Sequence, residues 1–289
     1  MRACRAALIL LTLYALGACS DAPLPEHKSG TYQRVVTLAP NLTELVFAAG
    51  AGGSLIGVSA YSNYPPAALE LPIIGDAFMI DQEQLAILKP DLLLVWQGGT
   101  PAHVVDELRR VGFNVEVIRT SSLADVASAI RRIGILTGHT DDAEAAGRAY
   151  ERGLESIGGN SDQFTDIRVF YQVSQRPLFT VNGDHYVSEL IALCGGSNVF
   201  ADLDELAPTI DVESVVERDP EVLLASTDAG ESAFSEWQRW PHMAANEMGN
   251  HFLMPADAIG RATPRLLRAG EAVCEALAEA RRRRGDAKR

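Results

Sequence analysis

Short runs of branched apolar residues alternate with helix-like stretches along most of the chain. Strand-like runs are expected at residues 34–38, 55–58, 91–96, 114–118, 167–171 and 221–225. Strands that lead repeatedly into helices are typical of a parallel sheet with helices on both faces. Residues 141–157 interrupt this alternation, because they are rich in Ala, Glu and Arg, begin with acidic residues and end at two glycines, as one capped helix does. The sequence therefore predicts an α/β fold arranged as lobe, helix, lobe.

Helix starts carry recognisable capping signals. Asn41 and Glu44 have the spacing of a capping box at the start of the first helix. The pattern Ile-Asp-x-Glu occurs twice, beginning at residues 80 and 210, and each copy is followed ten residues later by a Pro and a buried strand. The Asp of each copy suits an N-cap, and the Glu would lie near the positive end of the helix. Two lobes built on one plan explain this repeat, and two unrelated junctions with the same residues remain the alternative.

The N-terminus reads as an export signal. Two arginines precede an apolar run at residues 6–15, and Leu-Gly-Ala-Cys follows. A basic start, a short apolar core and small residues before a cleavage site describe a secretory signal. Leu-Gly-Ala-Cys resembles the lipobox of bacterial lipoproteins, which predicts lipidation of Cys19 and a lipid anchor in the membrane. A plain cleaved signal is the alternative.

The boundaries that follow from these features divide the chain into six parts. They are a lipoprotein signal peptide at 1–18, the lipidated Cys and a flexible tether at 19–33, an N-terminal lobe at 34–140, a connecting helix at 141–159, a C-terminal lobe at 160–283 and a basic tail at 284–289. The arginines at 281–284 are interpreted as a solvated helix end. With 25 basic and 38 acidic residues, the net charge of −13 disfavours nucleic-acid binding, because phosphate backbones are repelled.

The cysteine count favours one disulfide. Cys4 leaves with the signal and Cys19 would carry lipid, so Cys194 and Cys274 remain. An even pair in an oxidising compartment suggests a disulfide, and two separate buried thiols are the alternative. No Cys/His cluster is present, so a metal site is not supported.

Catalysis has no local signature in the sequence. There is no GxSxG, GK[ST], HExxH or GxGxxG motif, and the six histidines are scattered as surface or loop residues without ligand spacing. We therefore expect a protein that is not an enzyme and has no catalytic cofactor.

Aromatic residues and glycines at the ends of strands are more informative. Tyr61 follows the second strand, Trp96 ends the third and precedes Gly98 and Gly99, and Phe179 lies in the second half. Ligands of parallel α/β sheets bind beyond the carboxyl ends of the strands. Aromatic rings offer apolar faces there, and paired glycines permit close approach of the backbone to a ligand. Local loop packing is the alternative for each ring taken singly, whereas together they favour a ligand platform.

Several sequence blocks resemble periplasmic cobalamin-binding proteins of the BtuF type. The blocks run in order from about residue 34 to 280: RVVTLAPNLTELVFAAG, IGVSAYSNYPP, LAILKPDLLLVWQGG, LFTVNG, ALCGGSNVF and RATPRL. The resemblance implies two Rossmann-like lobes with parallel sheets, joined by a single rigid connecting helix, with the ligand cleft between them. It also implies capture of cobalamin or a related corrinoid in the periplasm and delivery to the permease of an ABC importer.

The resemblance assigns roles to individual residues. Tyr61 and Trp96 match aromatic residues that contact the corrinoid in that family. Phe179 matches a further aromatic residue of the second lobe, and Asp257 matches an acidic residue on the ligand side. A monomer is expected for the free protein.

The same resemblance assigns a partner surface. Glu83 and Glu213 match two glutamates, one on each lobe, that dock into basic pockets of a two-fold permease. Cys194 and Cys274 match the disulfide of the family.

Four positions depart from the family pattern. Aromatic residues of the family appear here as Ala77, Ala207, Ala258 and Val173. Phe78 could replace the first of them by a shift of one residue. A cleft with fewer rings would be roomier, so the departures bear on which corrinoid is bound.

Three rival functions can be stated. A haem or ferric-siderophore binding protein of the same fold would use Tyr61 as a haem-iron ligand, or Arg176 and Arg261 for an anionic siderophore. An enzyme on a similar scaffold needs convergent acid, base or metal groups that the sequence does not display. A surface adhesin needs neither a cleft nor paired docking glutamates.

Overall fold

The computed structural model describes residues 31–76, 79–159 and 165–286. Cys19, the predicted signal peptide, most of the predicted tether, Ala77 and Phe78 lie outside these residues. We use N-lobe for residues 31–138 and C-lobe for residues 165–286. Within the described residues, no helix combines the length and the apolar character required to cross a membrane.

The N-lobe contains one parallel sheet of four strands. In chain order they are β1 (Val35–Thr37), β2 (Leu55–Gly57), β3 (Leu92–Trp96) and β4 (Val115–Ile118), and their order in the sheet is β2-β1-β3-β4. Its helices are α1 (Pro40–Ala48), α2 (Gln82–Leu88), α3 (Ala102–Arg110) and α4 (Leu123–Thr137), with short 3₁₀ helices at Gly52–Ser54 and Pro66–Glu70.

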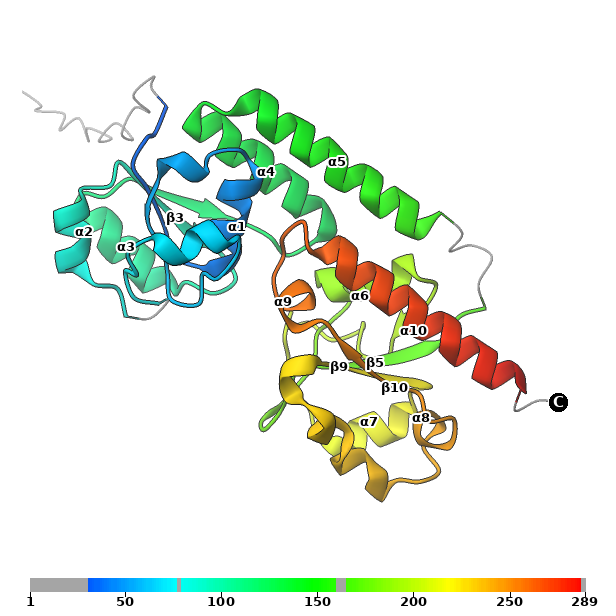
Figure 1. Cartoon of the computed structure of the whole chain (residues 1–289). Helices are drawn as coiled ribbons and strands as arrows, with labels where there is room; N and C mark the ends of the chain where they lie inside the picture. The colour runs from blue at the N-terminus through cyan, green and yellow to red at the C-terminus, as the bar shows by residue number, and fades with distance from the viewer. Residues whose placement is uncertain (1–30, 77–78, 160–164, 287–289) are drawn as a thin grey trace, which may run out of the picture. The chain divides into compact units, whose positions relative to one another are not determined.

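Alternate residues of each strand of the N-lobe enter different cores. On β3, Leu92 and Leu94 pack with α1 and α4, whereas Leu93 and Val95 pack with α2 and α3. All four side chains are buried, as expected for a parallel strand covered on both faces. Figure 1 shows α1 and α4 on one side of β3 and α2 and α3 on the other.

A long helix, α5 (Thr140–Gly158), links the lobes and matches the connecting helix expected at 141–159. It packs along α4 over much of its length (Figure 1). The two helices approach closely at Gly134, where an added Cβ would lie 2.2 Å from the Cβ of Ala143. Arg131 of α4 also pairs with Glu144 and Glu151 of α5, at 2.7 and 2.6 Å.

The C-lobe repeats the plan of the N-lobe. Its parallel strands are β5 (Arg168–Gln172), β8 (Ser197–Asn198), β9 (Val222–Ser226) and β10 (His251–Met254), in the order β10-β9-β5-β8. Numbered from the first strand of each lobe, both sheets therefore have the order 2-1-3-4. The C-lobe adds an antiparallel hairpin of β6 (Ser174–Gln175) and β7 (Leu178–Phe179).

Helices cover both faces of the second sheet as well. They are α6 (Tyr186–Leu193), α7 (Val212–Arg218), α8 (Ala244–Glu247), α9 (Ala256–Ile259) and α10 (Leu266–Asp286), with 3₁₀ helices at Thr227–Ala229, Glu231–Phe234 and Glu236–Arg239. Residues of α6, α9 and α10 share one apolar core, and residues of α7 and α8 share another with Trp237. In Figure 1, α10 and α7 lie on opposite sides of β9 and β10.

The sequence repeat corresponds to one helix in each lobe. Asp81 caps α2 by accepting a hydrogen bond from the amide of Gln84, and Asp211 caps α7 by accepting one from the amide of Ser214. Both helices end at a left-handed residue, Lys89 in α2 and Asp219 in α7. The prediction of two lobes on one plan is supported down to the backbone conformation.

The residues that enter the first strand of each lobe extend the repeat. The guanidinium of Arg34 donates to the C-cap carbonyl of α2, and that of Arg168 donates to the C-cap carbonyl of α7, both at 3.2 Å. The amides of the same two arginines donate to the carboxylates of Asp91 and Glu221, at 3.0 and 3.1 Å. Two unrelated helix–strand junctions with similar capping residues would not be expected to share these hydrogen bonds. The contacts therefore favour two lobes built on one plan.

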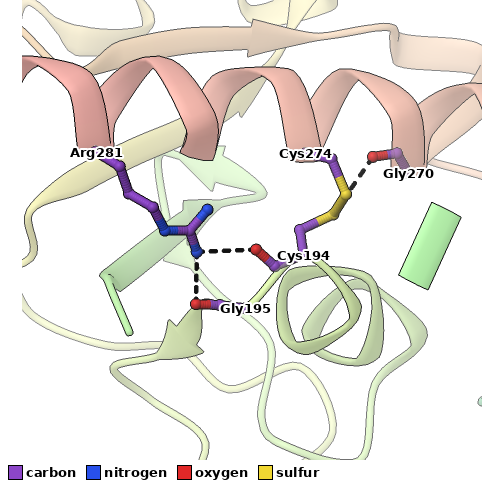
Figure 2. Close-up of a disulfide and its surroundings, with 5 residues drawn as sticks. All are labelled: Cys194, Gly195, Gly270, Cys274 and Arg281. Carbon is purple, nitrogen blue, oxygen red and sulfur yellow. Dashed lines mark hydrogen bonds between the residues drawn. A yellow bond between two sulfur atoms is a disulfide. The ribbon is translucent and has the colours of Figure 1, made fainter. Parts of the chain in front are cut away.

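A disulfide joins Cys194, at the end of α6, to Cys274 in α10 (Figure 2). The predicted pairing is confirmed, and the alternative of two separate thiols is wrong. About two turns further along α10, Arg281 donates to the carbonyls of Cys194 and Gly195, at 2.9 and 2.7 Å (Figure 2). These carbonyls belong to the C-terminal end of α6, where a cation is favoured by the helix dipole.

The interpretation of the arginine run as a solvated helix end and tail is only partly correct, because Arg282 is exposed whereas Arg284 is largely covered. Helix α10 continues to Asp286, beyond the predicted start of a basic tail at 284. Arg284 pairs with Glu221 at 3.0 Å, and Arg283 pairs with Glu279 and contacts the ring of Phe252. These side chains fasten α10 to the sheet, a role that a run of like charges does not reveal by itself.

The expected capping box of α1 is also wrong. The N-cap is Ala39, without a side-chain cap, and Pro40 supplies the fixed first turn instead. The amide group of Asn41 donates to Thr120 Oγ1. Glu44 turns away from the helix start towards two arginines of the C-lobe.

Candidate functional site

A pocket of about 690 Å³ lies in the C-lobe. It is found beyond the carboxyl ends of β5 and β9, beside the β6–β7 hairpin and the start of α9. Lining residues include Val173, Arg176, Ser226, Asp228, Glu236, Ala256 and Gly260. The sequence-based expectation that ligands bind beyond the carboxyl ends of parallel strands agrees with this position.

Charged residues of both signs line the pocket. They are Arg176 and two acids, Asp228 and Glu236, and Glu236 already pairs with Arg239 at 2.6 Å. Among the described lining residues, Arg176 is the one cation. Such a balanced set suits a ligand rich in amides better than a strongly anionic one, because anions are recognised by clusters of arginine.

A buried cluster of charges lies next to the pocket and joins the two lobes. We call it the Glu44 cluster: Glu44 of α1, Arg261 after α9 and Arg265 near the start of α10. The Glu44 side chain is only 2% exposed, and its carboxylate accepts hydrogen bonds from both arginines. Arg265 also lies over the ring of Tyr64, 4.5 Å from its centroid. Asp257 is further away, at 3.8 and 3.7 Å from the two guanidinium groups.

Tyr61 depends on this cluster for its main-chain contacts. Its φ is +66°, a left-handed conformation that is unusual outside glycine. Its carbonyl accepts a hydrogen bond from Arg261 at 3.0 Å, and the same guanidinium donates to Asn63 Oδ1 at 2.8 Å. The Tyr61 side chain itself is exposed, at 80%. We call residues 60–63 the Tyr61 turn. The backbone of this turn is held by hydrogen bonds, whereas the Tyr61 ring faces outward.

Trp96 ends β3 and folds back over the turn that follows it. Added Cβ atoms at Gly98 and Gly99 would lie 2.9 and 2.3 Å from the indole ring. The space above these glycines is filled by the tryptophan, so in this structure they make room for the Trp96 side chain. A direct contact of Gly98 and Gly99 with a ligand stays a prediction, and the half-buried indole is a further group at this turn able to meet a ligand.

Phe179 lies in β7, the second strand of the hairpin at the pocket. It pairs with Ser174 across the hairpin, and its carbonyl accepts a hydrogen bond from the amide of Val173 at 3.0 Å. Ser174 and Val173 line the pocket, and Val173 is 45% exposed. The hairpin thus carries one predicted aromatic residue and one position where the family aromatic is absent.

The predicted ligand residues are only partly brought together. Asp257 follows the lining residue Ala256, and Phe179 pairs with a lining residue. Tyr61, Trp96, Gly98 and Gly99 do not line this pocket. Tyr61 is nevertheless connected to its wall, because Arg261 directly follows the lining residue Gly260. A cleft shared by both lobes stays a prediction.

Two positions of missing aromatics differ in environment. Ala207 is exposed, so nothing nearby limits a larger ring there. Ala258 is 1% exposed within α9, where a larger side chain would require the core to repack. Because Ala258 belongs to the core, an alanine at this position does not by itself widen a ligand cleft.

Sequence reasoning missed Glu44 as a partner of the two arginines. A signal was present, because Glu44 is the one acid in an otherwise apolar or neutral run, PNLTELVFAAG. A carboxylate on a buried helix face requires a cationic partner. Its partners, Arg261 and Arg265, are 217 and 221 residues away in the sequence, and no local pattern indicates them.

Glu83 and Glu213 are both exposed and lie in the first turns of α2 and α7. The repeat thus presents one acidic side chain per lobe in the same local setting. Their assignment to a permease stays a prediction.

His185 lies in the loop directly before α6, in agreement with the expected surface or loop position, and it is half-buried. It caps α6, where its Nδ1 accepts a hydrogen bond from the amide of Val187, and its ring packs on Tyr186. Burial lowers the pKa of His185 to about 4. Among the described residues, no group of three or more His, Cys, Asp or Glu is arranged to hold a metal ion.

A model of the periplasmic binding protein family matches residues 35–258. The chain belongs to this family. The match spans both sheets from β1 into α9, including Tyr61 and the pocket-lining residues up to Ala256. The finding is consistent with a binding protein rather than an enzyme, and with a location in the periplasm.

The chain is similar to vitamin B12-binding proteins at substantial identity. The chain is 34% identical to a vitamin B12-binding protein of Vibrio cholerae over 246 residues, which is 85% of this chain and 89% of the relative. The crystal structure of the periplasmic vitamin B12 binding protein BtuF of Vibrio cholerae matches with a TM-score of 0.79 at 33% identity, covering 86% of this chain and 98% of that one. The fold prediction of two α/β lobes with parallel sheets is confirmed.

A haem-binding protein shares the fold at lower identity. The periplasmic heme-binding protein RhuT from Roseiflexus sp. RS-1 matches with a TM-score of 0.75 but 21% identity, covering 87% of this chain and 99% of that one. Such a likeness shows the architecture alone.

Proposed function

We propose that this chain is the solute-binding component of an ABC importer that captures cobalamin or a related corrinoid in the periplasm and delivers it to a permease. The observation that carries the proposal is the 34% identity to a vitamin B12-binding protein across 89% of that protein's length. Two structural features support it. The pocket has room for part of a large ligand, and its charges are balanced, as suits the neutral amide groups on the rim of a corrin ring.

We assign the ligand surface to both lobes. Tyr61 and Trp96 would supply aromatic faces from the N-lobe, and Phe179 and Asp257 would border the ligand in the C-lobe. Gly98 and Gly99 would act indirectly, by seating the Trp96 ring. Val173 and Ala207 leave room where relatives of this type carry aromatic residues, which favours a corrinoid with a bulkier or differently placed lower ligand.

Haem or a ferric siderophore is the second candidate, supported by the fold shared with RhuT. Tyr61 is exposed and could approach a haem iron. Arg261, however, is committed to Glu44, Asn63 and the Tyr61 carbonyl, which leaves Arg176 as the described pocket arginine for an anionic ligand. The site therefore favours the corrinoid.

Fluorescence titration tests the ligand. We expect cobalamin to quench Trp96 emission, because the indole would lie against an absorbing ring system. Trp96→Phe should lose this component, and Trp237, which is fully buried in the C-lobe, provides an internal reference. Native mass spectrometry with corrinoids, haem and ferric siderophores should retain a corrinoid at one per chain. Retention of haem with no corrinoid bound would overturn the assignment.

The finer location and the partners belong to the same proposal. Cys19 would carry lipid and anchor the protein to a membrane, Glu83 and Glu213 would dock on a two-fold permease, and the free protein would be monomeric. Cell fractionation tests the anchor, since Cys19→Ala should move the protein from the membrane to the soluble fraction. An unchanged distribution would contradict lipidation at Cys19.

A further inference from the structure

The Tyr61 turn receives hydrogen bonds from both lobes. Within the N-lobe, the hydroxyl of Ser62 lies 2.9 Å from that of Thr43, and the amide of Ala60 donates to the carbonyl of Gly75 at 2.7 Å. From the C-lobe, Arg261 donates to the Tyr61 carbonyl and to Asn63. The residues on either side of the tyrosine ring are thus fixed, although the ring itself has little packing.

We infer that Arg261 is a positioning residue for ligand binding, which sets the direction of the exposed Tyr61 ring by holding the backbone of the Tyr61 turn. The inference rests on the proposed function and deepens it. A left-handed tyrosine with an 80% exposed side chain gains little from its own contacts, so an external hold on its carbonyl is required to keep this conformation populated.

The Glu44 cluster makes this hold rigid. The guanidinium of Arg261 is 16% exposed and donates at the same time to Glu44, Asn63 and the Tyr61 carbonyl. Planar guanidinium groups lose little freedom per hydrogen bond, and the buried Glu44 carboxylate fixes their orientation. Gly260 lines the pocket and Arg261 is the next residue. The hydrogen bonds of Arg261 therefore connect the Tyr61 turn to the wall of the pocket.

Ligand affinity should depend on this arrangement even without a direct contact to Arg261. A ring already held in place does not have to be ordered when the ligand binds, so the cost of ordering is removed from the affinity. When the hydrogen bonds from Arg261 are removed, the ring has to be ordered on binding, and ligand affinity should fall. The effect should pass through Tyr61 and disappear when the tyrosine ring is absent.

Arg261→Ala is a usable variant, because Arg265 still makes two hydrogen bonds to Glu44 and keeps the buried carboxylate paired. We expect Arg261→Ala to weaken cobalamin binding by about tenfold, the change in Kd that corresponds to loss of one well-formed interaction. Tyr61→Ala should weaken binding by at least as much. The double variant should bind no more weakly than Tyr61→Ala alone.

Arg261→Lys separates charge from geometry. One ammonium group can pair with Glu44 but does not reproduce the forked contact to Asn63 and the Tyr61 carbonyl, so it should not restore affinity. Asn63→Ala removes one of the held contacts and should give a smaller loss in the same direction. Arg110→Ala is the matched control, since Arg110 is exposed and pairs only locally with Glu107 in the described structure.

Hydrogen exchange without ligand provides an independent readout. Amides 61–63 should exchange faster in Arg261→Ala than in the wild type, with α10 unchanged. Additive losses in Arg261→Ala and Tyr61→Ala, or unchanged exchange at 61–63, would overturn the inference. Failure of the wild type to bind any corrinoid would instead refute the proposed function, and the exchange result would still decide whether Arg261 holds the turn.

Discussion

The helix pair α1 and α4 in the N-lobe has a counterpart in α6 and α10 of the C-lobe. In each lobe the first helix follows the first strand, and it packs on the helix that comes after the fourth strand. The N-lobe pair is joined by apolar packing, and α1 begins at Pro40 without a side-chain cap. The C-lobe pair is joined by the disulfide Cys194–Cys274, and α6 begins at a histidine cap.

The difference between the pairs lies in what is added to the apolar packing. Helix α4 leads into α5, which packs along it and pairs with Arg131. Helix α10 contacts α5 over a shorter stretch and buries an apolar face that includes Val273 and Leu277. The disulfide, Arg281 and Arg284 attach α10 further. Apolar packing thus stabilises the helix pair in both lobes, and the C-lobe pair has a covalent link that the N-lobe pair lacks.

The largest expected effect is loss of the disulfide. The loop that it closes spans 80 residues, for which chain entropy gives an upper figure of about 4.5 kcal/mol. We expect the double variant Cys194→Ser, Cys274→Ser to lose roughly 3 kcal/mol or more of unfolding free energy in urea. Peptide mapping without reductant should find the crosslinked peptide in exported protein. Two alkylatable thiols there would contradict the pairing.

Tryptophan positions make this test specific to a lobe. Trp96 lies in the N-lobe, whereas Trp237 and Trp240 lie in the C-lobe. In a Trp96→Phe background, emission reports the C-lobe, and the disulfide variant should lower its midpoint. In the reciprocal background, Trp237→Phe with Trp240→Phe, emission of Trp96 reports the N-lobe. If its midpoint shifts equally, the lobes unfold as one unit and the contrast between them does not extend to stability.

Much of the fold could be predicted because its strongest signals are local. The five-residue strands β3 and β9 are continuous apolar runs, and the Asp caps of α2 and α7 have the expected spacing. Strand β8 has only two residues, and β10 has four and begins with a histidine. Neither has an apolar run long enough to be distinguished from the neighbouring sequence. Short strands of this kind are defined by their partners in the sheet rather than by their own residues.

The site was less predictable, since its key contacts depend on how the folded chain orients side chains, whether the residues are distant or adjacent in sequence. Aromatic residues at strand ends could be identified from position alone. The pairing of Glu44 with Arg261 and Arg265 could not, and neither could the packing of Trp96 on Gly98 and Gly99. Both depend on which groups the fold brings together. The arginines at the end of α10 were partly misread for the same reason.

A second, smaller effect concerns the caps of the two equivalent helices. The folded-state pKa of His185 is lowered to about 4 by burial, below the ordinary value of 6.5. The unfolded chain therefore takes up the proton first as pH falls. Stability is fully present above pH 6.5 and is lost as pH falls towards 4. Protonation would also turn the Nδ1 acceptor into a donor facing the amide of Val187.

Replacement by a cap that does not titrate tests this effect. His185→Asn should retain an N-cap and remove about 2 kcal/mol of the loss in unfolding free energy between pH 7 and pH 4.5. Since α1 has no titratable cap, changes there should leave the pH dependence as it is. Equal acid sensitivity in the wild type and His185→Asn would show that His185 is not the source.

The smallest effect on folding is expected where the lobes are most alike. Glu83 and Glu213 are exposed in equivalent first turns, so their replacement by Ala should change unfolding free energy by less than about 1 kcal/mol. At a protein interface, a glutamate that faces a desolvated cation contributes on the order of 2 kcal/mol or more. Each single variant should therefore weaken association with the cognate permease, by a similar factor, without changing ligand affinity.

The double variant and a charge reversal sharpen this prediction. Glu83→Ala with Glu213→Ala should reduce co-purification with the permease and uptake by well over tenfold, and Glu83→Arg should be worse than Glu83→Ala because it adds repulsion. Glu155→Ala on α5, also exposed, is the matched control. If the two single variants weaken association with the permease by different factors, the two lobes contribute unequally to docking despite their shared plan. Lost ligand binding with normal association would place these glutamates at the ligand and exclude the docking role.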